Sequence, residues 1–153
     1  CSEVVLIVPG DSTLGINDFA DLAREDVKRV ATGDPAITTV GVATMEILPT
    51  LDMLEAVQPK LIYGQTVNQA VDYAARGEVD AALVWAAEAK TRGDKVRLVA
   101  TADQSWYRKV EFVIGAVAAS ENVTLSRAFI DFVMSADGQA ILAEYGFSEP
   151  STQ

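Results

Sequence analysis

Short runs of apolar and β-branched residues alternate with helix-like segments along most of the chain, and this alternation limits the possible folds sharply. The runs typical of strands are residues 3–8, 28–31, 60–63, 80–85 and 96–101. Between them the sequence predicts helices over residues 16–24, from the stretch 37–41 to about residue 57 with a kink at Pro49, and over 66–76, ended by Gly77. This order predicts an α/β fold with a mostly parallel sheet flanked by helices.

The last part of the chain has a different pattern. A long strand is predicted over residues 110–119, followed by two consecutive helices over 122–134 and 136–145. Each helix has an apolar stripe, and the members are Ala128, Phe129, Phe132 and Val133 in the first and Ile141, Leu142 and Tyr145 in the second. Such stripes need a covering surface, because each large side chain left in water costs about 1.5–3 kcal/mol.

Composition excludes several classes of function. The 153 residues, half of them hydrophobic, suit one globular domain without a membrane-spanning run. With 22 acidic and 12 basic residues the net charge is -10, which argues against nucleic acid as a partner. The chain has no histidine, so Ser-His-Asp triads, Cys-His pairs and His-based zinc sites are excluded. We therefore expect no enzyme and no metal site.

Cys1 is the only cysteine, so it cannot form an internal disulfide. A mature bacterial lipoprotein also begins with a cysteine, but a flexible spacer usually follows it. Here the apolar run over residues 4–8 follows almost at once, which favours a trimmed or processed chain over a lipid anchor.

Two loop-to-helix junctions are candidate ligand sites, because ligands of open α/β sheets lie beyond the carboxyl ends of strands. The first spans residues 32–41 and includes Thr39 and Val40; the second spans 63–68 and includes Thr66 and Val67. Free N–H groups at a helix start attract an anion without a cationic side chain. The alternative is that the first junction is only a turn and Thr66 only an N-cap.

Trp85 ends the predicted strand 80–85 at the same edge. Its indole N–H can donate a hydrogen bond to an oxyanion, or its ring can fill the top of the core. No P-loop or GxGxxG pattern is present, so nucleotide binding has little support.

Several motifs, taken in order, resemble the periplasmic molybdate/tungstate-binding proteins of ABC transporters, the type II solute-binding family. They occupy residues 6–9, 29–35, 40–43, 58–61, 66–71, 76–81, 96–100 and 140–147. The resemblance implies a non-enzymatic, extracytoplasmic binding component with a membrane permease as partner, molybdate or tungstate as ligand, and no cofactor. It implies backbone donors at Val40 and Val67 and a side-chain donor at Trp85, where the family usually has tyrosine.

The resemblance also implies a two-lobed, periplasmic-binding-protein-like fold from which the family's N-terminal segment is missing. Residues 3–110 would form the complete second lobe, 111–148 would belong to an incomplete first lobe, and 149–153 would be a tail. The uncovered stripes then predict a companion N-terminal fragment, a homodimer, or helices repacked on their own domain. The alternative function is a ligand-sensing or interaction domain of a regulatory protein. We expect a periplasmic or extracytoplasmic location, with membrane association if Cys1 is lipidated.

Overall fold

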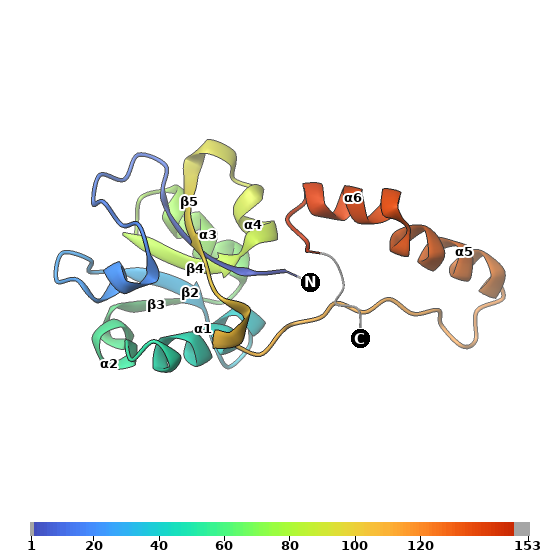
Figure 1. Ribbon diagram of the computed structural model, residues 1–153, viewed down its shortest axis with the longest axis horizontal. Helices are drawn as coiled ribbons and strands as arrows, with labels where there is room; N and C mark the ends of the chain where they lie inside the picture. The colour runs from blue at the N-terminus through green and yellow to red at the C-terminus, as the bar shows by residue number, and fades with distance from the viewer. Residues whose placement is uncertain (1, 149–153) are drawn as a thin grey trace.

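The computed structural model describes residues 2–148 and contains a sheet-based lobe from which the C-terminal part extends (Figure 1). The strands are β1 (Val4–Pro9), β2 (Val30–Gly33), β3 (Leu61–Gly64), β4 (Ala81–Trp85) and β5 (Val96–Thr101). The α-helices are α1 (Thr39–Thr50), α2 (Leu54–Val57), α3 (Val67–Ala75), α4 (Ala86–Lys90), α5 (Val123–Met134) and α6 (Ala136–Glu144). Short 3-10 helices are η1 (Phe19–Ala23), η2 (Gln58–Lys60), η3 (Gly93–Lys95) and η4 (Gln104–Trp106).

The five strands lie in the order β3-β2-β4-β1-β5. Strand β2 pairs in parallel with β3 and β4, whereas β1 is antiparallel to both β4 and β5. Four strands therefore run in one direction, which confirms the predicted mostly parallel α/β sheet. The reversed strand is β1, and it lies in the interior of the sheet.

Both faces of the sheet are buried, as a sheet flanked by helices requires. Successive residues of β1 point to opposite sides: Leu6 contributes to the core that includes residues of α1, and Ile7 to the core that includes residues of α3. Every residue of β1 and β4 is buried. The two helices therefore cover opposite faces.

Local residue chemistry sets the helix ends. Thr38 caps α1 and Thr66 caps α3, each accepting a hydrogen bond from a backbone N–H of the first turn. Gly77 has a φ of 68° and follows the end of α3, as predicted. The helix predicted to continue to residue 57 is divided into α1 and α2, because Pro49 lies in the last turn of α1 and Asp52 adopts a left-handed φ of 55°.

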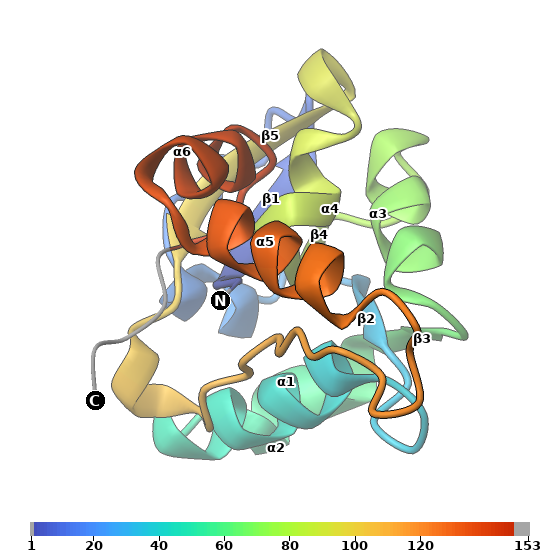
Figure 2. The same cartoon turned by 90° about the vertical axis from the view of Figure 1, so that its right-hand side faces the viewer.

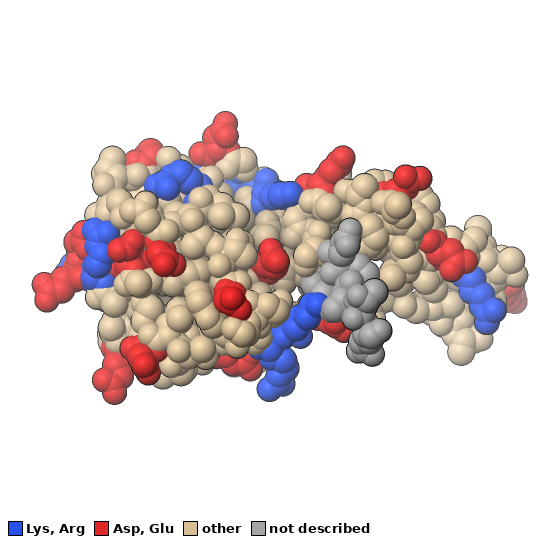
Figure 3. All heavy atoms as spheres, in the orientation of Figure 1, with Lys and Arg blue, Asp and Glu red and all other residues tan. Residues whose placement is uncertain are grey.

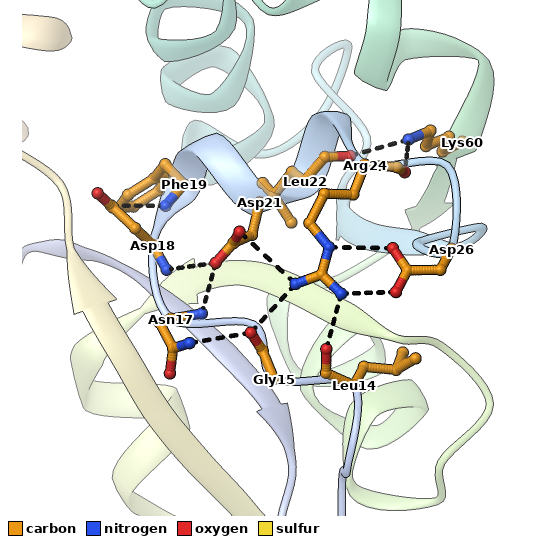
Figure 4. A network of polar contacts seen from close by, with 10 residues as sticks. All are labelled: Leu14, Gly15, Asn17, Asp18, Phe19, Asp21, Leu22, Arg24, Asp26 and Lys60. Atoms are coloured by element: carbon orange, nitrogen blue, oxygen red, sulfur yellow. Dashed lines mark hydrogen bonds and ion pairs between the residues drawn. The ribbon is translucent and has the colours of Figure 1, made fainter.

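The helix predicted over residues 16–24 is the shorter 3-10 helix η1, capped by Asp18. A polar network fixes the surrounding loop (Figure 4). In it, Arg24 bonds Asp26 and the Leu14 carbonyl, and Lys60 Nζ donates to the Leu22 and Arg24 carbonyls at 2.9 and 2.7 Å. The loop before β2 is thereby tied to the start of β3.

Residues 111–148, here called the arm, extend away from the lobe (Figures 1 and 2). The predicted strand 110–119 is wrong: these residues belong to no strand of the described structure, and residues 111–119 are all exposed. The sequence has strand propensity, but a strand needs a neighbour to accept its ladder of hydrogen bonds. The two predicted helices are confirmed as α5 and α6.

The arm meets the lobe through few contacts. Ser2 forms an isolated antiparallel bridge with Phe147, and Lys90 Nζ donates to the Ala143 and Glu144 carbonyls at 3.0 and 3.3 Å. Neither apolar stripe is covered, with Phe129 58% and Ile141 47% exposed. The predicted repacking of α5 and α6 on their own domain therefore does not occur in the described structure. Among residues 2–148, no helix has the length and apolar character to cross a membrane.

Candidate functional site

Three strand-to-helix junctions meet at one edge of the sheet. Strands β2, β3 and β4 run in parallel, so their carboxyl ends share that edge; Gly33 at the end of β2 pairs with Gly64 at the end of β3. Helix α1 starts after β2, α3 after β3, and α4 directly after Trp85. The two candidate junctions and Trp85 thus lie at the predicted edge, with α1 and α3 approaching it from opposite faces.

The first junction is tightly built around Thr38. Its Oγ1 accepts from Gly41 N at 3.1 Å and donates to the Asp34 carbonyl at 2.8 Å. A Cβ on Gly33 would collide with the Thr38 side chain, and one on Gly41 with the Gly33 carbonyl. These two glycines let the helix start lie directly against the end of β2. Within residues 2–148 the Val40 amide, in the first turn, has no hydrogen-bond acceptor.

The second junction is a similar cap with an additional bond. Thr66 Oγ1 accepts from Gln69 N at 3.2 Å, while Gln69 Oε1 accepts from Gln65 N at 2.7 Å. The amide of Val67, the first residue of α3, has no acceptor among the residues described. The side chain of Val67 packs against both cores, which places this helix start at the rim of the sheet.

Trp85 is buried, with only 3% of its surface exposed. Its Nε1–H donates to Thr39 Oγ1 at 3.3 Å, which links the end of β4 to the first residue of α1. Its ring packs against Tyr107, with centroids 6.3 Å apart, and Tyr107 Oη accepts from Val4 N at 3.1 Å. The Trp85 ring therefore fills the core, and its N–H is already hydrogen-bonded to Thr39.

A cavity of about 190 Å³ opens beside the start of α1. Its lining residues are Thr39, Val42, Ala43, Glu46, Arg108 and Val110. Of the predicted site residues, Thr39 alone lines this cavity, and Trp85 reaches it through Thr39. Thr66 and Val67 share the sheet edge with them but not this cavity, so the described residues bring the predicted donors to one edge without enclosing a ligand.

The electrostatics near the site depend on burial. Desolvation raises the pKa of Glu88 in α4, whose Oε2 is buried with no hydrogen-bond partner in the described structure. Desolvation also raises the pKa of Tyr107, partly offset by the hydrogen bond from Val4. No cluster of three metal-ligating side chains occurs within residues 2–148. On the face shown in Figure 3, basic residues form small separate groups and no continuous basic surface.

Sequence reasoning missed Tyr107 and the link between Trp85 and Thr39. Tyr107 was not among the predicted site residues, yet it is only 6% exposed and its hydroxyl accepts from Val4 N at the start of β1. The linkage of Trp85 to Thr39 spans 46 positions and left no local signal.

Comparisons with known proteins agree on one family. The model described as "Bacterial extracellular solute-binding protein" matches residues 1–148. YvgL of Bacillus subtilis is 26% identical over 147 residues, which are 96% of this chain and 55% of the relative. The molybdate-binding protein ModA of Escherichia coli is 29% identical over 120 residues, covering 78% of this chain and 46% of ModA. The chain spans about half the length of the curated relatives it matches.

Solved structures share the fold. A substrate binding domain from Clostridium difficile matches with a TM-score of 0.88 and 25% identity over 98% of this chain and 64% of that one. The periplasmic molybdate-binding protein of Azotobacter vinelandii matches with a TM-score of 0.72 and 18% identity over 98% and 66% of the two chains. These matches include the arm as well as the lobe.

Proposed function

The chain belongs to the bacterial extracellular solute-binding protein family, and from this premise we propose that it binds a tetrahedral oxyanion, molybdate or tungstate, for an ABC transporter. One observation carries the proposal: the Val40 and Val67 amides lack acceptors at the starts of two helices that meet at one sheet edge. Relatives named as molybdate-binding proteins support this choice of ligand. The role is binding rather than catalysis, as in the family as a whole.

Neutral donors suit this chain. With a net charge of -10, long-range attraction of an anion is absent, and short-range donors must replace the water around the ligand. A helix start offers several N–H groups together with the positive end of the helix dipole. Thr39 and Thr66 stand beside those amides and add hydroxyl groups. The arrangement favours a compact ion whose oxygens only accept hydrogen bonds.

The site is half of a two-lobed one under this proposal. Residues 3–110 are the second lobe, and residues 111–148 belong to the first, whose remaining part is an N-terminal segment that binds the arm. Two features support this: the exposed stripes of α5 and α6, and an apolar cavity of about 320 Å³ beside Phe112, Val113 and Ile114. The part of the relatives that this chain does not match is long enough to cover the stripes and the cavity.

Isothermal titration with sodium molybdate tests the binding proposal. We expect weak binding by the chain alone and tighter binding after the N-terminal segment is added, because closure of two lobes buries the ion. No heat at millimolar molybdate in either sample would overturn the proposal.

Val67→Pro tests the backbone donor directly. Thr66 already has the extended φ and ψ of -136° and 158° that precede proline, and proline is well tolerated at the first position of a helix. The substitution removes the N–H, and we expect about tenfold weaker binding. Val67→Ala keeps the N–H and is the matched control, with affinity unchanged within about twofold.

Native mass spectrometry tests the companion. We expect a one-to-one complex of the chain with the N-terminal segment; a stable homodimer that excludes this segment would contradict the proposal. Membrane association rests on Cys1, which lies outside the described residues, and intact mass of the exported protein measures whether a lipid is attached.

A further inference from the structure

Trp85 occupies the position where the proposed site expects a side-chain donor, yet its N–H is already used. The indole Nε1–H donates to Thr39 Oγ1 at 3.3 Å, and Trp85 is only 3% exposed. Tyr107 fixes the ring from the side, with centroids 6.3 Å apart at 53°. Tyr107 is itself held by the hydrogen bond from Val4 N to its hydroxyl. The direction of the indole N–H is thus set before any ligand arrives.

The Thr39 hydroxyl is the other half of this pair. A hydroxyl has one hydrogen to donate and lone pairs to accept. Its oxygen accepts from Trp85, so its hydrogen must point elsewhere, and no acceptor for it occurs among residues 2–148. Thr39 is exposed, is the first residue of α1, and lines the 190 Å³ cavity. The free hydrogen is therefore available at the helix start.

We infer that Trp85 is a positioning residue whose indole N–H orients the Thr39 hydroxyl, and that Thr39 supplies the side-chain hydrogen bond to the bound oxyanion. This rests on the proposed function and assigns the donor within the same site. The indole does not touch the ligand. Its role is to fix which way the Thr39 hydrogen points, which saves the ordering cost when the ion binds.

The test uses the 153-residue chain with its side-chain indole nitrogens labelled with ¹⁵N, titrated with sodium molybdate and followed by NMR. Thr39→Val removes the hydroxyl at nearly constant shape, and we expect about tenfold weaker binding. Thr39→Ser keeps the hydroxyl and is expected to bind within about threefold of the parent. Trp85→Phe removes the N–H and keeps an aromatic ring, with an expected loss of about threefold.

The double variant separates the two roles. If Trp85 acts only through Thr39, adding Trp85→Phe to Thr39→Val changes the affinity less than twofold, because the group to be oriented is already gone. If the losses multiply, Trp85 contributes on its own and the inference is wrong. If the parent shows no saturable shift either alone or with the N-terminal segment added, the proposed function itself fails, and the inference with it.

A second measurement does not depend on the ligand. In the ligand-free chain, Thr39→Val is expected to move the Trp85 indole ¹H resonance upfield and speed its exchange with water, while Thr39→Ser leaves both nearly unchanged. Trp106 has the second indole, whose ring packs on Phe19, and it serves as the internal reference. Equal behaviour of the Trp85 resonance in both variants would overturn the inference even if Trp85→Phe folds poorly.

Discussion

The lobe and the arm contain the same kinds of amphipathic segment, but only the lobe buries them. In the lobe, α3 buries Ala70, Val71 and Ala74 against the sheet. In the arm, α5 buries no residue and α6 only Gly138. The comparison shows that an apolar stripe specifies which face of a helix will be covered, whereas the covering surface has to come from another part of the fold.

The arm nevertheless has defined helix ends, because these depend on local bonds. Ser135 serves both helices: its Oγ donates to the Phe132 carbonyl at 2.7 Å and accepts from Gly138 N at 3.3 Å. A Cβ on Gly138 would collide with the Phe132 carbonyl, so glycine permits the sharp corner. Local structure in the arm is thus complete where burial is not.

Truncation of apolar side chains in the two regions gives the largest expected difference. Leu83→Ala in β4 removes a fully buried side chain, and we expect the free energy of unfolding to fall by about 2–5 kcal/mol. Phe129→Ala in α5 removes a side chain that is 58% exposed, with an expected change within about 0.5 kcal/mol. Urea denaturation measures both. Comparable losses would mean that the arm is covered in solution.

Adding the proposed N-terminal segment is expected to remove the difference. Amides of residues 112–117 should exchange rapidly in the chain alone and at least about 100-fold more slowly in the complex, because they would then form strand hydrogen bonds. Hydrogen exchange read by mass spectrometry measures this, with β4 peptides as the protected control. Equal exchange with and without the segment would contradict pairing at this stretch.

A buried hydroxyl pair fixes α1 to the sheet inside the lobe. Thr32 and Thr44 approach at 2.8 Å between their Oγ1 atoms, and Thr44 Oγ1 donates to the Val40 carbonyl at 2.9 Å. We expect Thr44→Val to cost about 1–2 kcal/mol, since it leaves the Thr32 hydroxyl without its partner. Combining it with Thr32→Val should recover part of that loss in thermal unfolding; a further additive loss would argue against the pair.

Glu88 lies in α4, the helix whose Lys90 bonds the arm, and its raised pKa sets the sign of a pH effect. The folded state holds the proton more tightly than the unfolded state, so the penalty is present above the folded pKa and vanishes below the unfolded one. Glu88→Gln should therefore stabilise the chain at pH 7 and have little effect near pH 4. A gain that persists at low pH would point to another cause.

The smallest expected effect concerns the bond from Lys90 to the end of α6. Lys90→Met removes a cation from a helix C-terminus at an exposed position, which costs about 0.3–1 kcal/mol at most. We expect the free energy of unfolding to change by less than about 1 kcal/mol, while amides of α6 exchange faster. Lys95→Met, elsewhere on the lobe, is the control that should leave α6 unchanged.

Most of the lobe could be predicted because its signals are local. Apolar runs located the strands, Thr66 marked a helix start, and Gly77 marked a helix end. The antiparallel direction of β1 could not be predicted from local signals, since strand direction depends on how the chain returns to the sheet. The predicted strand 110–119 failed for a related reason: propensity is a property of the segment, but a strand exists only with its neighbour.

The candidate site was predictable only in part. The two loop-to-helix junctions follow from the sequence pattern and the donors at Val40 and Val67 from the family resemblance, and the structure leaves both amides without acceptors among the residues described. The partner of Trp85 was not predictable, because Thr39 reaches it through the packing of α1 on β4. Local chemistry therefore indicates where donors lie, and tertiary packing decides which of them remain available.

The reversed direction of β1 bears on how the chain could be joined to a further segment. Its amino end pairs with Trp85, and the preceding Ser2 bridges Phe147 at the base of the arm. A polypeptide fused ahead of Ser2 would emerge beside both the helix starts and the arm, so its docking would be intramolecular. At effective concentrations in the millimolar range for a short linker, even weak pairing with the arm would saturate. Fusion there should outperform adding the same segment in trans.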